Sequence, residues 1–461
     1  MSEQNTPMMS LGQLAHFLRL PLDSSLDSLE VNRISTDSRR IEKGDVFIAL
    51  EGEQFNGHDY VSQALHKGAV CALVNEHWVP PADLSSACLL KVQDTLISLG
   101  QLAHVWRKKI NPFVIALTGS NGKTTVKEMM ASIMRAHALQ IGYEDNAVLA
   151  TEGNLNNAIG VPLTLLALRS HHRFAVVEMG MNHTGEIAYL SKIAQPDIAL
   201  INTVQRAHIG LLGSIEAIAQ AKSEIFVGLD KEGVAVYPTD LSTSSILAQA
   251  ANPYRQLTFA MGAAADITGA IKGEDLTVSG FGETLSVRLH IPGRHNRDNA
   301  LAVTAACFAA GVRASEIIHG LESFSGVPGR LQAQFSALGA LVIDDTYNAN
   351  PDSVYAAINV LSEREGRKIL VLGDLGELGQ FAQELHQEIG LRAKESGIDN
   401  LYVVGQLTHY SVASFGVNAH HYESVEEIIA VLKPQLNSET TVLVKGSRFM
   451  QMERVVKGLM Q

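Results

Sequence analysis

The chain has 461 residues, of which 46% are hydrophobic and 18% charged, and its formal net charge is -12. Because this length exceeds what one hydrophobic core usually supports, we expect more than one domain, and three is the working number. The negative charge argues against a general nucleic-acid binder, since such binding needs clustered Lys and Arg side chains. The most apolar window, residues 300–312, is shorter than the ~20 residues of a membrane-spanning helix, so no membrane span is expected.

The cysteines and the start of the chain suggest where the protein works. Cys71, Cys88 and Cys307 are far apart in the sequence and lack metal-ligand spacing, which favours a reducing compartment. The first residues contain no basic stretch followed by an apolar core, so they do not read as a secretory signal. We therefore expect a cytoplasmic protein, and we expect it to be a monomer.

Residues 1–110 are predicted to form a small α/β domain. Within them, residues 34–52 contain two possible short strands around a polar turn. From residue 111 to 326, short β-rich runs alternate with helical stretches, which predicts a parallel sheet covered by helices. Because ligands bind at the carboxyl ends of strands in such sheets, the chemical groups that follow these runs should share one site.

A phosphate-binding loop is predicted between the first of these runs, residues 113–119, and an amphipathic helix that follows it. The loop reads TGSNGKTT, in which backbone N–H groups and the helix N-terminus would face phosphates and Lys123 would neutralise their charge. The usual pattern has a glycine at the position of Leu117, whereas here the glycine is Gly119, which argues against motor and GTPase families. The alternative is a glycine turn with a surface lysine. The residues expected to bind the nucleotide here are Thr118, Gly119, Ser120, Asn121, Gly122, Lys123, Thr124 and Thr125.

Residues 327–461 carry a second alternating set of strands and helices, which predicts a Rossmann-like α/β domain. Residues 326–332 form a plausible hinge before it. Asn350 is the expected N-cap of the helix that follows the first strand, with Pro351 at its first position. The fold class is therefore α/β with three domains: a small N-terminal domain, a central P-loop ATPase domain and a Rossmann-like C-terminal domain.

The loop resembles the TGxxGKT(T/S) loop of the Mur ligases and of the related folylpolyglutamate synthetases. Further segments of the same family occur in order along most of the chain: STDSRR, EGNLNNAIGVPLTLL, EMGMNHTGEI, AKSEIF, PGRHNRDNALA, DDTYNANPDS, VLGDLGELG and VKGSRFMQME. DDTYNANPDS and EMGMNHTGEI are most similar to the corresponding segments of members that add D-alanyl-D-alanine to UDP-N-acetylmuramoyl-tripeptide. The resemblance implies ATP-dependent amide ligation through an acyl phosphate, in the cytoplasmic stage of peptidoglycan synthesis.

The resemblance also implies the catalytic and metal-binding residues. Thr124 and Glu178 are expected to bind a first Mg²⁺, because hard cations prefer oxygen ligands. Lys222 is expected to become a carbamate that, with His208 as its neighbour, binds a second Mg²⁺. Without the resemblance, Glu178 would be a plain strand-end carboxylate and Lys222 a solvated helix residue.

The remaining residues are assigned to ATP and to the two other substrates. Asn296 and Asn299 are expected at the nucleotide base, Arg330 on phosphate, and one of Asp344 and Asp345, preferably Asp345, on the ribose. A capped, partly buried helix start is the alternative for the two asparagines. The residues implied for the UDP-linked substrate are Thr36, Asp37, Ser38, Arg39, Asn154, Asn156 and Asn157, and those for the dipeptide are Asn348, Asn350, Lys445, Ser447 and Arg448.

Two other functions are compatible with the loop alone. A folate or polyamide polyglutamylating ligase would share it, although STDSRR before the ATP domain argues against that enzyme. A nucleotide-dependent switch would bind ATP without ligation, and its basal hydrolysis would not respond to amino-acid substrates.

Overall fold

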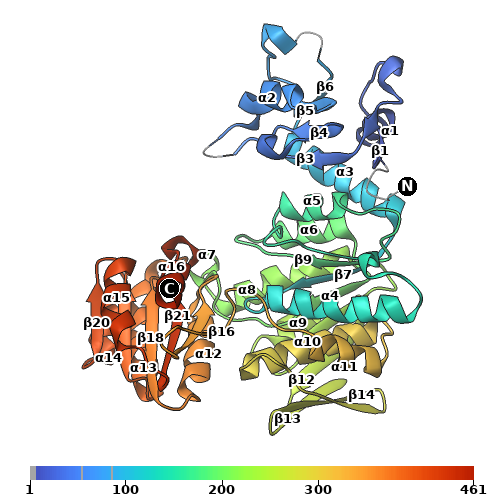
Figure 1. Cartoon of the computed structure of the whole chain (residues 1–461). Coiled ribbons are helices and arrows are strands. Elements are labelled where there is room, and N and C mark those ends of the chain that lie inside the picture. The colour runs from blue at the N-terminus through green and yellow to red at the C-terminus, as the bar shows by residue number, and fades with distance from the viewer. Residues whose placement is uncertain (1–6, 53–54, 85–86) are drawn as a thin grey trace.

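The computed structural model describes residues 7–52, 55–84 and 87–461, and it divides into three α/β units (Figure 1). Residues 1–6, part of the start for which no secretory signal is expected, lie outside the described residues. The predicted fold class is confirmed. Among the described residues, no helix is long and apolar enough to cross a membrane.

The N-terminal unit is built on a parallel four-stranded sheet, ordered β3-β4-β5-β6. Its strands are β3 (Arg33–Ser35), β4 (Asp45–Ile48), β5 (Cys71–Asn75) and β6 (Leu89–Val92). The sheet is flanked by α1 (Leu11–Leu18), α2 (Val61–His66) and a short ribbon of β1 (Met9–Ser10) and β2 (Glu30–Val31). Because Ala72 pairs with Leu89, Cys71 and Cys88 are cross-strand neighbours, and hydrogen bonding with Cys88 raises the pKa of Cys71. Cys71 and Cys88 are thus far apart in the sequence but adjacent in the fold.

Helix α3 (Thr95–Ile110) links the first unit to the second and packs on the second. Trp106 donates from Nε1 to the carbonyl of Leu168 at 3.1 Å, and Arg107 donates to the carbonyls of Ala194 and Gln195, both at 2.8 Å. These bonds tie the helix to the central unit although its residues precede the proposed boundary at residue 110.

The central unit contains a nine-stranded sheet, ordered β15-β14-β13-β12-β11-β10-β7-β9-β8. The strands β7 to β13 are parallel, and β14 pairs antiparallel with both β13 and the edge strand β15. Their bounds are β7 (Phe113–Thr118), β8 (Val148–Ala150), β9 (Phe174–Glu178), β10 (Ile198–Ile201), β11 (Val234–Pro238), β12 (Arg255–Met261), β13 (Ile267–Lys272), β14 (Asp275–Gly280) and β15 (Glu283–Val287).

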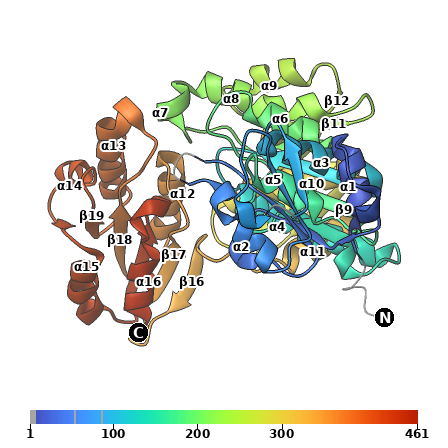
Figure 2. The ribbon, with the colours of Figure 1, turned by 90° about the horizontal axis from the view of Figure 1, so that it is seen from above.

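Helices cover both faces of this sheet because its inner strands are buried on both sides. In β7, Val114 and Ala116 face one apolar cluster, and Ile115 and Leu117 face the other. One face carries α5 (Gly160–Leu166), α6 (Glu186–Ala194), α8 (Ile215–Ser223) and α9 (Ser244–Ala251), and the other carries α4 (Lys123–Gln140), α10 (Arg294–Ala309) and α11 (Ala314–Glu322) (Figure 2).

The C-terminal unit has a six-stranded sheet, ordered β16-β17-β21-β18-β19-β20, in which only β16 is antiparallel. Its strands are β16 (Gln332–Phe335), β17 (Leu341–Asp345), β18 (Arg367–Gly373), β19 (Asn400–Val404), β20 (Ala419–Tyr422) and β21 (Thr440–Lys445). Its helices are α12 (Pro351–Ser362), α13 (Ala382–Glu395), α14 (His409–Phe415), α15 (Val425–Leu432) and α16 (Glu453–Met460). Asn350 caps α12 by accepting from the Ser353 N–H, and Pro351 opens the helix, as predicted.

Candidate active site

A cavity of about 1550 Å³ lies at the carboxyl ends of the central strands and is lined by the central unit, the C-terminal unit and the linking helix α3. The central unit supplies the phosphate loop, residues at the carboxyl ends of β9, β10, β11 and β12, and the start of α10. The C-terminal unit adds residues 345–357 and 376–378, and α3 adds Leu96 and Ile97. A site assembled in this way can hold a substrate that extends across more than one unit.

The loop between β7 and α4 has the geometry of a phosphate cradle. Gly122 has a φ of 75°, which L residues with side chains rarely adopt, and Lys123 begins α4. The free N–H groups at the start of this helix therefore face the cavity, where they attract anions. Residues 120–125 line the cavity, whereas Thr118 and Gly119, also expected at the nucleotide, do not.

Asn202, which the sequence analysis missed, fixes the shape of this loop. It follows β10, the neighbour of β7, and its Nδ2 donates to the carbonyl of Asn121 at 2.7 Å. A Cβ atom on Gly119 would lie 1.6 Å from Asn202 Oδ1. Gly119 thus makes room for a protein side chain behind the loop. The position of Asn202 after a strand of the alternating set was the one signal that could have revealed it.

Substituting Gly119 with alanine should therefore weaken nucleotide binding by about tenfold, since overpacking a well-filled site costs about 1–3 kcal/mol. Calorimetric titration with a magnesium-ATP analogue measures this change. A chain with both Gly119→Ala and Asn202→Ala should bind as well as Asn202→Ala alone, because the clash has then been removed. Wild-type affinity for Gly119→Ala would contradict the close contact.

Two lysines converge on one backbone carbonyl beneath the loop. Lys123 Nζ and Lys222 Nζ each donate to Gly119 O at 3.0 Å. Burial lowers the pKa of Lys123, while the Glu178 carboxylate opposes that effect. Burial, reinforced by the charge of Lys123, lowers the pKa of Lys222 well below its usual value. Two full positive charges are unfavourable at this spot, so Lys222 is the better candidate for a neutral amine.

One carboxylate oxygen of Glu178 is hydrogen-bonded and the other is not. Its Oε1 accepts from Asn156 Nδ2 at 2.8 Å, and its Oε2 is buried without a hydrogen-bond partner among the described residues. An unpaired buried carboxylate oxygen is costly, and a hard cation satisfies it. The structure therefore fits a cation at Glu178. No group of three or more His, Cys, Asp or Glu side chains that could hold a metal occurs in the described part of the chain, so further ligands would come from hydroxyl groups, substrate or water.

His208 faces the C-terminal unit. It caps α7 (Ile209–Leu212) with a φ of 63°, and its Nδ1 lies 2.6 Å from Glu377 Oε2. Hydrogen bonding to His208 lowers the pKa of Glu377. Across the described residues no hydrogen bond joins His208 to Lys222, the neighbour expected from sequence. The sequence could not give this result because Glu377 is remote along the chain.

Arg330 reaches into the phosphate loop from the segment before β16. Its Nη2 donates to Thr124 Oγ1 at 2.9 Å, and its guanidinium lies 4.3 Å from the centre of the Tyr347 ring. Its Nε is buried without a hydrogen-bond partner among the described residues. This placement agrees with the expected contact to phosphate.

The two asparagines expected at the nucleotide base are both buried, and Asn299 supports the phosphate loop. A Cβ atom on Gly122 would lie 2.5 Å from Asn299 Oδ1, and the same oxygen accepts from Asn202 Nδ2 at 3.1 Å. Asn296 Nδ2 donates to the carbonyl of Pro292 at 2.7 Å. Both residues line the cavity, but their amides are engaged by protein groups, as expected for a partly buried helix start; neither caps α10, which begins after Gly293 without a side-chain cap.

Asp345 and Lys445, each expected to bind a substrate, form an ion pair with each other. Lys445 Nζ donates to Asp345 Oδ2 at 2.6 Å and to the carbonyl of Asn348 at 3.0 Å. Their strands, β17 and β21, are adjacent, and Asp345 pairs with Lys445 in register. Burial raises the pKa of Asp345, and Lys445 opposes this rise. Each residue therefore neutralises the other at the cavity wall, where one was expected on ribose and the other on the dipeptide.

The remaining dipeptide candidates divide into two groups. Asn348, Asn350 and Arg448 line the cavity. Ser447 is buried behind the wall, where its Oγ accepts from the Gly376 N–H at 2.9 Å, so the structure does not bring it to the cavity surface.

The candidates for the UDP-linked substrate lie in two places. Asn154, Asn156 and Asn157 line the cavity. Thr36, Asp37, Ser38 and Arg39 sit after β3 in the N-terminal unit and are not part of the cavity wall. There Arg39 Nε donates to Asp37 Oδ1 at 2.9 Å, and this bond lowers the pKa of Asp37 to about 2. An exposed Arg39 remains available to a ligand on that unit.

Asp298 is a second cavity residue that the sequence analysis missed. Its Oδ1 is buried without a hydrogen-bond partner among the described residues, and burial raises its pKa to about 6. Because the folded pKa exceeds the usual value of 3.8, this carboxyl lowers stability as the pH rises from about 4 through 6. The sequence did contain a signal, since Asp298 lies within HNRDNALA, but only the two asparagines of that segment were considered.

We expect Asp298→Asn to raise the thermal unfolding midpoint at pH 7, with little gain near pH 4, where the acid is already neutral. Calorimetric scans at both pH values measure the difference. Asp59→Asn, at an exposed acid of the N-terminal unit, is the control and should show no such increase with pH. An equal effect of Asp298→Asn at both pH values would contradict the role of its charge.

Models of known families match nearly the whole chain. Residues 30–137 match the Mur ligase family catalytic domain, 117–307 the Mur ligase middle domain, and 329–448 the Mur ligase glutamate ligase domain. Similar proteins include the UDP-N-acetylmuramoyl-tripeptide--D-alanyl-D-alanine ligases of Haemophilus influenzae and Escherichia coli. They are 39% and 38% identical, over 98% of this chain and 98% of each relative.

Solved structures agree with these matches. MurF from Acinetobacter baumannii has a TM-score of 0.89 and 35% identity, over 99% of both chains. MurF ligase from Thermotoga maritima in complex with ADP has a TM-score of 0.81 and 27% identity, over 93% of this chain and 96% of that one. Escherichia coli FolC, at 20% identity and a TM-score of 0.58, shares the fold. The chain belongs to the Mur ligase family and is an ATP-dependent ligase.

Proposed function

We propose that the protein joins D-alanyl-D-alanine to UDP-N-acetylmuramoyl-tripeptide at the expense of ATP, releasing ADP and phosphate. The observation that carries this proposal is the match over nearly the full chain to ligases that bear this name. It is supported by a phosphate loop that opens into a cavity shared by the central unit, the C-terminal unit and the linking helix α3. The reaction belongs to the cytoplasmic stage of peptidoglycan synthesis, and the protein acts there as a monomer.

Each of the three units binds one substrate, in the order in which the units occur along the chain. Residues 1–110 bind the UDP end of the first substrate, with Thr36, Asp37, Ser38 and Arg39 as contacts. Residues 111–326 bind ATP, and residues 327–461 bind the dipeptide and close over the nucleotide. The path of the first substrate runs from the N-terminal unit past α3 to Asn154 and Asn157, which line the cavity near Glu178.

In the first step the terminal carboxylate of the tripeptide attacks the γ-phosphorus of ATP, and ADP leaves. Two anions must meet, so positive groups have to surround the point of attack. The start of α4 and Lys123 bind the phosphates, and Arg330 adds a second positive charge beside Thr124. The product is an acyl phosphate.

Mg²⁺ fits the oxygen ligands of this site, with Glu178 and Thr124 for one ion and a carbamate on Lys222, near His208, for another. When bound, the ions would screen the repulsion between carboxylate and triphosphate. A carbamate forms only on a neutral amine, and the lowered pKa of the buried Lys222 supplies one. The carbamate would also place a negative charge next to Lys123, where the neutral amine has none.

In the second step the free amine of D-alanyl-D-alanine attacks the acyl carbon, phosphate leaves, and the amine loses a proton. Acyl phosphates hydrolyse, so this step requires that water be excluded. Contacts between the phosphate loop and the C-terminal unit support this exclusion, since Arg330 and Asn350 both reach the loop.

Phosphate release tests this proposal. It should require UDP-N-acetylmuramoyl-tripeptide and D-alanyl-D-alanine together, and L-glutamate or diaminopimelate should not replace the dipeptide. Equal phosphate release with those acceptors would show that the chain is a different ligase of the same family. Release that is indifferent to every amino-acid substrate would indicate a nucleotide-dependent switch.

A further inference from the structure

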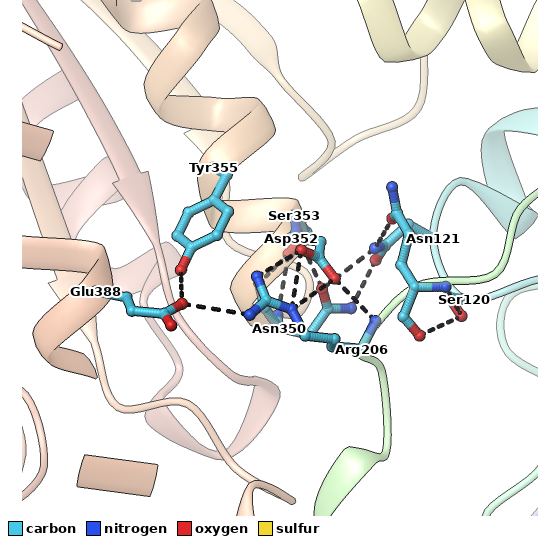
Figure 3. Close-up of polar contacts among 9 residues, drawn as sticks. Ser120, Asn121, Arg206, Asn350, Asp352, Ser353, Tyr355 and Glu388 are labelled. Carbon is cyan, nitrogen blue, oxygen red and sulfur yellow. Dashed lines mark hydrogen bonds and ion pairs between the residues drawn. The ribbon is translucent and has the colours of Figure 1, made fainter. Parts of the chain in front are cut away.

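A short strip of the central unit, residues 205–210, lies against the C-terminal unit. It follows β10 and includes the first two residues of α7. The side chain of Arg206 extends from it towards Asp352 of α12 and Glu388 of α13 (Figure 3). At its far end the Gly210 N–H donates to the carbonyl of Glu377 at 3.0 Å. A Cβ atom on Gly210 would lie 2.4 Å from the backbone nitrogen of Gly379, so the two units touch there through their backbones.

Arg206 binds both helices of the other unit. Its Nη2 donates to Asp352 Oδ1 at 2.8 Å, and its backbone N–H donates to Asp352 Oδ2, also at 2.8 Å. Its Nη1 lies 3.3 Å from Glu388 Oε2, which in turn accepts from Tyr355 Oη at 2.6 Å. Hydrogen bonding with Asp352 raises the pKa of Arg206 above its usual value. Lysine could not reproduce this set of contacts, because they use the planar fork of arginine.

The same strip is bonded to the phosphate loop. Ser120 Oγ donates to the carbonyl of Gln205 at 2.9 Å, and Asn121 Nδ2 donates to Gln205 Oε1 at 2.5 Å. Asn121 also exchanges amide hydrogen bonds with Asn350, the N-cap of α12, at 2.6 and 3.2 Å. Asp352 is in the first turn of that helix, where a carboxylate is favoured by the helix dipole. One bonded chain therefore runs from the phosphate loop through residues 205 and 206 to the start of α12.

We propose that Arg206 is a positioning residue that clamps the start of α12 over the phosphate loop, and so brings the dipeptide-binding unit to the activated carboxylate. The part that concerns the dipeptide depends on the proposed function, whereas the clamp itself does not. Arg206 acts through Asp352 and Glu388 and contacts no reacting atom. In its absence the loop, Lys123 and Glu178 remain in the central unit, so nucleotide binding should persist while the second step slows.

A double-mutant cycle with Arg206→Gln and Asp352→Asn tests the clamp. Both changes remove a charge; Asp352→Asn keeps the shape of the side chain, and Arg206→Gln removes the guanidinium that makes the contact. Each single variant should lower kcat/KM for D-alanyl-D-alanine by about tenfold, as loss of one partner of a partly buried, hydrogen-bonded charge pair does. The double variant should lose no more than the worse single one. The dissociation constant of a magnesium-ATP analogue, measured without the other substrates, should change by less than about threefold.

Arg392→Gln is the matched control, because Arg392 packs on the same Tyr355 ring at 5.7 Å but belongs to the C-terminal unit itself. It should keep wild-type activity. Small-angle X-ray scattering with the ATP analogue gives a readout of closure that is independent of ligation: the radius of gyration should increase in Arg206→Gln and not in Arg392→Gln. Circular dichroism confirms that each variant is folded.

The results separate the clamp from the proposed function. Additive losses in the cycle, an unchanged radius of gyration, or an equal loss of nucleotide affinity would each overturn the clamp. If the wild-type protein does not use D-alanyl-D-alanine, the proposed function fails, and the scattering comparison alone then decides whether Arg206 is a clamp.

Discussion

Replacing Lys123 with alanine should reduce ligation about a thousandfold, the upper end of what one preorganised charge contributes to a transition state. Lys123 is the first residue of α4 and lines the cavity, so its ammonium joins the helix N-terminus at the phosphates. The charge that develops when a carboxylate attacks the γ-phosphorus would lose its nearest fixed counter-charge. The measurement is phosphate release at saturating concentrations of all three substrates.

The control for this experiment is Lys108→Ala, at an exposed lysine of α3. It should ligate as well as the wild-type protein and so exclude a general effect of removing one positive charge. Calorimetry should show weaker nucleotide binding for Lys123→Ala and none of this loss for Lys108→Ala. Product formation by Lys123→Ala at the wild-type rate would remove the basis of the phosphate-loop assignment.

Replacing Lys222 with methionine should also be severe, with about a hundredfold loss of ligation, because a buried amine beside the phosphate loop would become an apolar group. In wild-type protein, buffer freed of carbon dioxide should lower activity, and added bicarbonate should restore it. The amine nitrogen attacks carbon dioxide and loses a proton, so restoration should be greater at higher pH, where more of the amine is neutral. The lowered pKa of Lys222 makes this possible near neutral pH.

Lys222→Met itself provides the control, since its residual activity should not respond to bicarbonate. Mass measurement of the intact protein in bicarbonate gives a second readout, in which the wild-type chain gains the mass of one carbon dioxide and the variant does not. Wild-type activity in Lys222→Met, together with an unmodified Lys222 in bicarbonate, would contradict the carbamate.

Local patterns were sufficient to predict most of the fold. The strand, loop and helix from residue 113 to 140 follow from apolar periodicity and a glycine-rich turn, and Asn350 with Pro351 marked the start of α12. The strands β13, β14 and β15 were not predicted. They are short and carry glycine, lysine and acids, residue types that are depleted in strands, so propensity gives little signal there.

Contacts between distant segments could not be read from the sequence. Asp345 and Lys445 were assigned separate ligands because nothing local shows that β17 and β21 are neighbours. His208 was assigned to Lys222, whereas its nearest carboxylate is Glu377, at the far side of a domain interface. Arg206 was overlooked for the same reason, since its partners Asp352 and Glu388 become visible only when the units are placed together.

The amide pair between Asn121 and Asn350 has a consequence for inhibitors. A small molecule that bridges these two side chains would be anchored in two units at once and could dissociate only when they separate. Its residence time would then be set by the opening rate of the protein, so slow-onset and long-lived inhibition is achievable from modest affinity for either half.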